Sequence, residues 1–496
     1  MVVGTTGNAT LLLQNNSNFG QPAPNVPITL GQNAGIQGTL TIGNGGNGAG
    51  VGYASVTTGA GSGVINFNEA SAFESSSTTY PFYPTISGNI AVIQNGNATT
   101  LLSPAGANTY TGGTVVNAGT IQLASANALP SAGGIEVNGG TFDLTGFSVP
   151  ISSLSINAGV FLTSMAGGEA SVSNSITTGG GTLSAPLSGT AALTQNGSGT
   201  TTVSGANTYS GGTNVVSGTL VLGSAAALPA GGNLTVSGGT MDLNGQSVGL
   251  LGALTVSGGT LSSSGGPVSL TPSSTTTMGG SIEVELTGSS SLTQQGAGTT
   301  TSINTPSSFT GATAINGGTL LLDTIGALGG TSSVSLTSSG TLLLAASNSV
   351  NDAASFDFNG GTLLMSSDLG EALGATTVTQ ESIIDLGGSS VELTFATLSI
   401  NAPLEVWNWT PSQDFLFLGS SNFSGNLSLI QFYSDSGNNA IGAGQLDGLQ
   451  IVPVPEPATP VLLLIAAGGI GAALRMKRSF GKCGAEEGVV AKADLF

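Results

Sequence analysis

Apolar and other residues alternate in short runs along most of the chain, with examples at Ile121 and Leu123, Leu220 and Leu222, and Leu320 and Leu322. A period of two places one set of side chains inward and the other outward, which predicts short β-strands. Turn pairs such as Asn196-Gly197 and Gly211-Gly212 separate the runs, and these residues accept the positive φ of tight turns. Strands this short bury a core only when copies of the unit stack.

The pattern repeats at two scales. Tyr110, Tyr209 and Phe309 lie 99 and 100 residues apart within related segments. Inside each segment, glycines that open a β-prone run recur at intervals close to 20 residues, so the long repeat corresponds to five turns of a stacked coil. The repeat motif consists of Asn108, Tyr110, Gly112, Gly113 and Thr114, then Asn207, Tyr209, Gly211, Gly212 and Thr213, then Phe309, Gly311 and Thr313.

The stretch GANTYSGGTNVVSGTL at residues 205–220 resembles the autotransporter-associated β-strand repeat of bacterial passenger domains. The resemblance covers roughly residues 35–400 and implies an all-β fold, a right-handed parallel β-helix. The copy around Phe309 departs from the motif because it lacks the Gly-Ala-Asn turn before the aromatic residue.

Changes in composition and repeat pattern along the chain suggest domain boundaries. We interpret residues 1–63 as glycine-rich passenger coils. We expect a truncated or misplaced start because MVVGTTGNATLLLQ has neither a basic region nor an apolar core typical of a secretory signal, and a genuinely cytosolic protein is the alternative. Residues 64–400 form the β-helix repeat region. Residues 401–452 contain Trp407 and Trp409, and we interpret them as an aromatic cap because a solenoid end exposes strand edges that must be covered.

Residues 453–478 combine a Pro-Glu-Pro motif, an apolar run and a basic cluster, and a predicted cytoplasmic tail, 479–496, follows them. An apolar run, Pro460 to Leu474, predicts one transmembrane helix at the short limit for a bilayer, and the basic residues after it place that side in the cytoplasm. This order resembles the PEP-CTERM sorting signal, in which an exosortase-type transpeptidase cuts near Pro-Glu-Pro at the inner membrane. The residues that match are Val454, Pro455, Glu456, Pro457, Arg475, Lys477 and Arg478. The tail is longer than the family pattern, and an ordinary membrane anchor is the alternative.

Charge excludes several function classes. All five basic residues lie within 475–496, the chain has no histidine, and 24 residues are acidic. Residues 1–474 therefore cannot neutralise phosphates, so nucleic-acid binding is not expected. They also cannot form a Ser-His-Asp triad or a histidine metal site. We expect no catalytic, cofactor or metal site.

Two carboxylate pairs are possible exceptions. Glu283 and Glu285, at i and i+2 of a strand, would lie about 7 Å apart on one face, which suits a glycosidase pair or a weak calcium site. Two acids on a solvent-facing strand are the commoner arrangement. Asp143 and Asp242 would lie about 24 Å apart, too far to act together.

These observations predict an exported, non-enzymatic cell-surface or extracellular-matrix solenoid that acts as a spacer or adhesin. Its expected partners are an exosortase-type enzyme and the inner membrane during sorting, and a polysaccharide or other surface component afterwards. One alternative is a polysaccharide-active β-helix enzyme that uses carboxylates only. Another is a fragment of an autotransporter passenger, although no series of about ten-residue alternating strands follows residue 400.

Overall fold

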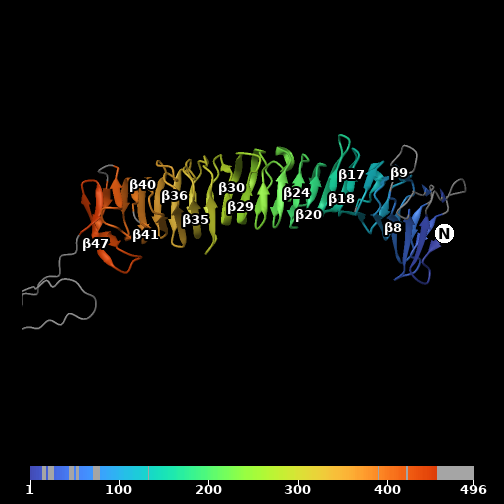
Figure 1. Ribbon diagram of the computed structural model, residues 1–496, viewed down its shortest axis with the longest axis horizontal. Coiled ribbons are helices and arrows are strands. Elements are labelled where there is room, and N and C mark those ends of the chain that lie inside the picture. The colour runs from blue at the N-terminus through green and yellow to red at the C-terminus, as the bar shows by residue number, and fades with distance from the viewer. Residues whose placement is uncertain are drawn as a thin grey trace, which may run out of the picture. The chain divides into compact units, whose positions relative to one another are not determined.

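The computed structural model describes residues 1–13, 18–19, 27–43, 50–51, 55–70, 79–131, 133–388, 390–419 and 423–454. Contacts divide the chain into two units, Met1–Pro455 and Glu456–Phe496, and the described residues all belong to the first. Within that unit the chain is a β-solenoid of right-handed type with about 17 turns. Its turns stack in sequence order from β8 to β47 (Figure 1). The described residues contain no α-helix, only three short 3-10 turns.

Two continuous parallel ladders run along the solenoid. In the first, Leu193 pairs with Thr213 and Thr213 with Leu234, so one turn takes 20 or 21 residues. Its strands are β2 (Ala9–Leu13), β5 (Gln37–Ile42), β8 (Ser62–Phe67), β11 (Ile90–Gln94), β14 (Thr114–Val116), β16 (Gly134–Val137), β18 (Ser148–Ile156), β20 (Glu169–Thr178), β23 (Leu193–Gln195), β25 (Thr213–Val215), β27 (Leu234–Val236), β29 (Val248–Ser262), β30 (Ser269–Ile282), β32 (Leu292–Gln294), β34 (Thr313–Ile315), β36 (Ser333–Thr337), β38 (Ser355–Asn359), β40 (Gly370–Gln380), β42 (Glu392–Ile400) and β45 (Phe423–Gly425).

The second ladder follows the turn after each strand of the first. Its strands are β9 (Thr79–Phe82), β12 (Thr99–Leu102), β15 (Thr120–Leu123), β17 (Thr141–Asp143), β19 (Val160–Leu162), β21 (Gly181–Leu183), β24 (Thr200–Val203), β26 (Thr219–Leu222), β28 (Thr240–Asp242), the C-terminal parts of β29 and β30, β33 (Thr300–Ile303), β35 (Gly318–Leu322), β37 (Gly340–Leu344), β39 (Thr362–Met365), β41 (Ser382–Asp385), β43 (Leu404–Trp407) and β46 (Ile430–Tyr433). The pairings place Asp143 and Asp242 five turns apart, as the sequence predicts.

A third ladder, on the remaining flank, is interrupted. It uses the N-terminal parts of β18, β20, β29, β30, β40 and β42 together with β1 (Val2–Val3), β4 (Ile28–Leu30), β7 (Val56–Thr58), β10 (Ser87–Gly88), β13 (Thr109–Tyr110), β22 (Leu187–Gly189), β31 (Glu285–Leu286) and β44 (Phe415–Leu418). The 3-10 turns η1 (Ala126–Ala128) and η2 (Ala225–Ala227) replace a strand on this flank. β3 (Asn18–Phe19) and β6 (Gly50–Val51) form a separate pair. The interruptions leave this flank less regular than the other two.

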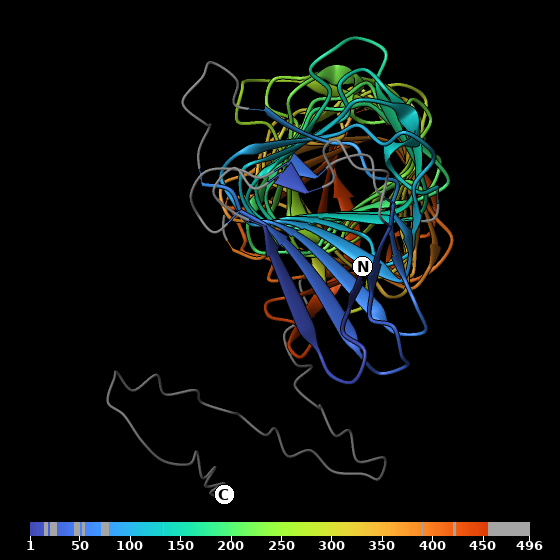
Figure 2. The same ribbon diagram turned by 90° about the vertical axis from the view of Figure 1, so that its right-hand side faces the viewer.

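The core is a column of inward-facing side chains. Buried and half-buried positions alternate in strands such as β26 and β37, which confirms the period-two prediction. Seen along the stack, the turns surround one common interior (Figure 2). Equivalent residues of neighbouring turns contact each other there, and the rings of Phe142 and Phe161 stack with centroids 5.7 Å apart.

The outer surface carries its own stack of amides. Asn66, Asn95, Asn117, Asn138 and Asn157 lie in successive turns, and each of the last four donates from its side-chain nitrogen to the preceding one at 2.7 to 2.8 Å. Adjacent strands are about 4.8 Å apart, so one amide per turn forms a continuous ladder. It ties five turns together outside the core.

The last turns differ from the predicted aromatic cap. Residues 401–433 continue the parallel ladders through β43 and β46, with Trp409 buried against Phe432 at 4.8 Å between centroids. After η3 (Leu427–Leu429), the direction changes only in β47 (Ala440–Asp447) and β48 (Gln450–Pro453). These two strands pair antiparallel with β46 and β44 and with each other. A separate aromatic cap is thus not seen, although the segment does end the parallel stack.

Candidate functional site

The asparagine of the repeat motif bridges neighbouring turns. Asn207 Oδ1 accepts a hydrogen bond from the Leu187 amide at 2.9 Å, and its Nδ2 donates to the Ala227 carbonyl at 2.7 Å. Asn108 makes the same two bonds, to Ile86 and Ala128. Both asparagines are at most 5% exposed. The sequence predicts them as turn residues. In the structure each is buried and bonds to the turn before it and the turn after it, an arrangement that we call the asparagine clip.

The aromatic residue of the motif is also internal. The Tyr110 and Tyr209 hydroxyls bond to Thr114 and Thr213 at 2.6 and 2.7 Å. Burial raises the pKa of both tyrosines, that of Tyr209 to about 12. Gly211 is required by close packing, because a Cβ there would lie 2.4 Å from the Ala192 amide nitrogen.

A buried glutamine was missed by sequence analysis. Gln195 Oε1 accepts from Thr178 and Thr201, and its Nε2 donates to the Gly197 and Gly199 carbonyls. Gln94 occupies the same place in the first copy. Its recurrence at the start of each motif was the signal that could have identified it. The repeat motif therefore acts mainly as internal structure that joins neighbouring turns.

The third copy loses the asparagine clip. Ser307 occupies the position of Asn207, and of the two bonds between turns its shorter side chain keeps only the one from the Leu286 amide to Oγ, at 3.3 Å. The Ser307 hydroxyl also donates to the nearby Thr305 carbonyl at 3.5 Å. Phe309 replaces the tyrosine, and Thr313 bonds instead to the Thr331 hydroxyl at 3.0 Å. The core of the third copy thus remains packed around Phe309, whereas the outer flank lacks one of the hydrogen bonds between turns.

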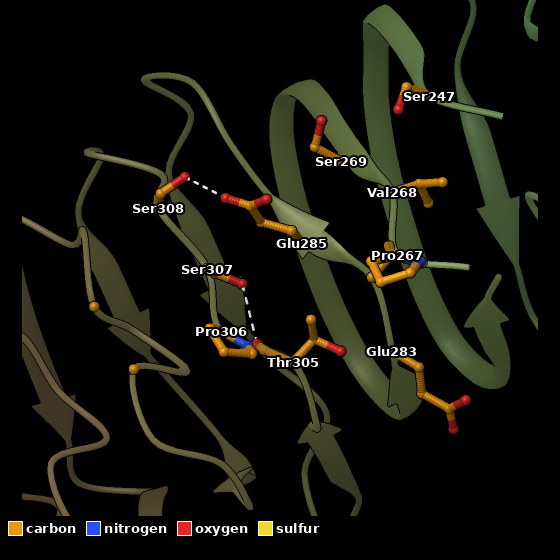
Figure 3. Close-up of a pocket in the computed structure, with 13 residues that line it drawn as sticks. Ser247, Pro267, Val268, Ser269, Glu283, Glu285, Thr305, Pro306, Ser307 and Ser308 are labelled. Carbon is orange, nitrogen blue, oxygen red and sulfur yellow. Dashed lines mark hydrogen bonds between the residues drawn. The ribbon is translucent and has the colours of Figure 1, made fainter. Parts of the chain in front are cut away.

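A hollow of about 700 Å³ lies on this flank (Figure 3). It forms where the third ladder stops, because β31 pairs with β30 on one side while 304–312 contain no strand on the other. Its lining includes Glu283, Glu285, Pro306 and Ser308. The Ser308 hydroxyl donates to Glu285 Oε1 at 2.6 Å and fixes that carboxylate.

The two glutamates do not form a facing pair. The prediction that they occupy one strand is wrong, because Glu283 follows the end of β30 at Ile282 and Glu285 begins β31. Neither side chain is buried, and Figure 3 shows Glu285 directed toward Ser308 and Glu283 directed away from it. Glu283 Oε1 instead accepts from the Ser281 hydroxyl at 3.1 Å. A concerted acid and base role would require the two carboxylates to converge on one bond, and they diverge.

Asp143 and Asp242 hold turns together. Asp143 Oδ1 accepts from the Thr145 and Ser164 amides, and Asp242 Oδ1 accepts from Asn244 and Ser264. Partial burial opposes ionisation of both carboxyls, but these hydrogen bonds outweigh it and hold both pKa values below their usual range. Each aspartate therefore joins its own turn to the next turn by hydrogen bonds.

The sorting residues fall almost entirely outside the described part of the chain. Val454 is its last residue and is 39% exposed, whereas Pro455, Glu456, Pro457, Arg475, Lys477 and Arg478 and the predicted apolar helix lie beyond it. Among the residues that the structure does describe, no helix is long and apolar enough to cross a bilayer. Within the same ranges, no group of three or more acidic or cysteine side chains could hold a metal ion.

Comparison with known families supports both resemblances. The passenger-associated-transport-repeat model matches residues 92–123, 193–222 and 292–322. The PEP-CTERM protein-sorting motif matches residues 453–478 and implies processing by an exosortase-type system. No curated protein and no solved structure matches the chain. The chain thus combines three passenger-associated-transport repeats in one β-solenoid with a C-terminal PEP-CTERM protein-sorting motif.

Proposed function

We propose that this protein is a non-enzymatic spacer or adhesin, exported and placed at the cell surface or in the surrounding matrix through its C-terminal signal. A stacked solenoid joined to a PEP-CTERM motif suggests an exported surface protein. That combination is the observation on which the proposal depends. A solenoid suits the role because each turn contacts only its neighbours, so its length is set by the number of turns.

The chemistry of the described side chains supports a non-catalytic role. Residues 1–474 supply no lysine, arginine or histidine. The two glutamates of the hollow diverge, and one is held by Ser308. The acids Asp143 and Asp242 are occupied in bonds between turns. A carboxylate-only enzyme would need a converging pair with unequal proton affinities.

The sorting step is tested by expressing the full chain in a host with an exosortase and in the same host without it. We expect a surface or secreted product whose C-terminus, located by mass spectrometry, lies near Pro457. This product should form only when the enzyme is present. Replacing Pro455, Glu456 and Pro457 by alanine should abolish that product, whereas the matched change of Glu283 to alanine should leave it unchanged. An intact membrane-bound chain ending at Phe496 would indicate a plain anchor, and an intact cytosolic chain would refute export.

The non-enzymatic role is tested separately with purified protein on a panel of polysaccharides. We expect no release of reducing ends or unsaturated products over long incubation. Activity that disappears in Glu283→Gln and persists in Glu169→Gln would refute the proposal and favour the carboxylate enzyme.

A further inference from the structure

Two hollows lie on the same flank of the solenoid. The larger one extends from Ser247 to Gly329, and a smaller one of about 240 Å³ is lined by Asn207, Ala226, Val248 and Leu250. Ser247 lines the larger hollow and the next residue, Val248, lines the smaller one, so the two hollows are neighbours on this flank. We call them together the flank groove.

Backbone contacts show that the flank groove runs along the stack. The Asn207 amide donates to the Ala226 carbonyl, Val248 pairs with Leu270, and Leu270 pairs with Leu286. The Ser308 amide then donates to Leu286, and Ser307 donates to Gly326. The positions 207, 226, 248, 270, 286, 307 and 326 are therefore successive turns. At about 4.8 Å per turn, six steps span about 29 Å.

The larger of the two hollows lies where the motif has changed. In the second copy Asn207 fills the space between turns and the hollow measures about 240 Å³. In the third copy Ser307 leaves that space open, and the hollow measures about 700 Å³. The departure from the repeat pattern therefore coincides with the enlarged cavity.

The flank groove offers side chains rather than a strand edge. Its backbone groups are engaged between turns, as in the bonds from Thr287 to Leu270 and from Ser308 to Leu286. An extended peptide binds a sheet by adding a strand to an open edge, and this part of the flank has none to offer. A ligand must be recognised by side chains, which disfavours a peptide.

The lining suits an uncharged sugar. Glu283 and Glu285 can accept hydrogen bonds from sugar hydroxyls, and the hydroxyls of Thr305 and Ser308 can donate or accept. The exposed Leu250, at 76%, offers an apolar surface beside them, as binding sites for small molecules commonly combine the two. Two carboxylates and no cation in residues 1–474 would repel an anionic ligand. The rise of one turn is also close to the advance of one sugar residue in an extended glycan.

We propose that the flank groove binds a linear, uncharged polysaccharide along the solenoid axis, with Glu285 and Ser308 as hydrogen-bonding groups and Leu250 as an apolar contact. This inference deepens the proposed surface function by naming its partner, and it rests on that function for its biological setting. Binding itself is a property of the purified chain and does not require export.

The test measures binding of the purified full chain to neutral hexasaccharides, namely cellohexaose, xylohexaose and laminarihexaose, by calorimetry. We expect at least one to bind with Kd below about 1 mM, and its affinity should rise with chain length up to about six or seven units. A galacturonate hexamer should not bind. Glu285→Gln should weaken binding about tenfold, and Ser307→Asn, which restores the residue of the other copies, should weaken it at least as much.

Glu169→Gln is the matched control, because Glu169 accepts a hydrogen bond from Ser188 as Glu285 does from Ser308, yet it does not line either hollow. It should bind as the original chain does. No neutral glycan bound below about 1 mM, equal binding of the galacturonate hexamer, or unchanged binding in a Glu285→Gln variant with an unaltered melting curve would overturn the proposal. Glycan binding by a chain that remains cytosolic would refute the export proposal alone.

Discussion

Replacing Asn207 by alanine should destabilise the turns that it joins. The Leu187 amide and the Ala227 carbonyl would each lose a partner, and both residues are fully buried. A buried polar group left unsatisfied costs about 1–3 kcal/mol. Two such groups give a loss of about 4 kcal/mol in the free energy of local opening.

The third copy supplies an internal comparison. Ser307 makes only one bond to another turn, accepting from the Leu286 amide at 3.3 Å, besides a long bond of 3.5 Å to the nearby Thr305 carbonyl, so Ser307→Ala should cost only about 1 kcal/mol. The same position thus carries two different predicted costs within one chain. The difference of about 3 kcal/mol between the two variants measures the contribution of the asparagine clip, because both variants shorten a side chain at the same position of the repeat.

Native-state hydrogen exchange read by mass spectrometry is the suitable assay. Turns of a solenoid contact only their neighbours, so global unfolding need not be two-state. In Asn207→Ala, the amide of Leu187 and those of the adjoining turns should exchange about a thousandfold faster, while turns beyond residue 340 should keep their protection.

Two results would refute this reasoning. One is an Asn207→Ala variant that loses no more protection than Ser307→Ala. The other is an equal loss along the entire solenoid, which would show that the clip acts through global stability and not between neighbouring turns.

Three further predictions concern the titration and strain of individual residues. Burial raises the pKa of Glu371 from 4.5 to about 7 against the bonds from the Ser349 and Val350 amides, so the folded chain keeps a proton that the unfolded chain has lost. The free energy of unfolding should then fall by about 3 kcal/mol as pH rises from 4.5 through 7. Urea midpoints measured across this pH range should show the fall in the original chain and not in Glu371→Gln, and an equal fall in both would contradict the prediction. Thr145 has φ of 52° and Asn244 has φ of 47° at the equivalent position. Asparagine accepts this left-handed conformation more readily than β-branched threonine, so Thr145→Asn should raise stability by about 1 kcal/mol and Asn244→Thr should lower it. Thermal melts with equal midpoints would contradict this prediction. Burial raises the pKa of Tyr209 from 10.0 to about 12, so stability should fall as pH rises between these values, and Tyr209→Phe should melt at a more nearly constant temperature over that range.

Much of the fold could be predicted from the sequence because each turn repeats the same local pattern. The alternation around Leu220 and Leu222 predicted the strands, and the glycine spacing predicted the turn length. The resemblance to passenger-domain repeats implied parallel stacking, and the pairings confirm all three. Periodicity works here because one register, repeated many times, leaves little freedom in the pairing.

The functional surface could not be predicted in the same way. The flank groove depends on where the third ladder stops after β31 and on the small size of Ser307, and the sequence showed only a weakened motif. The diverging directions of Glu283 and Glu285 follow from hydrogen bonds to Ser281 and Ser308, which strand spacing does not reveal. The role of Asn207 was likewise hidden, because a turn-forming residue and a buried amide look alike in a sequence.

The two antiparallel strands β47 and β48 have a consequence for molecules crowded together at high density. They occupy the exposed edges of β44 and β46, which a neighbouring molecule could otherwise extend with a parallel strand. Growth of a fibre by fusion at those edges is thereby blocked. Densely arrayed copies should therefore not join through these two strands.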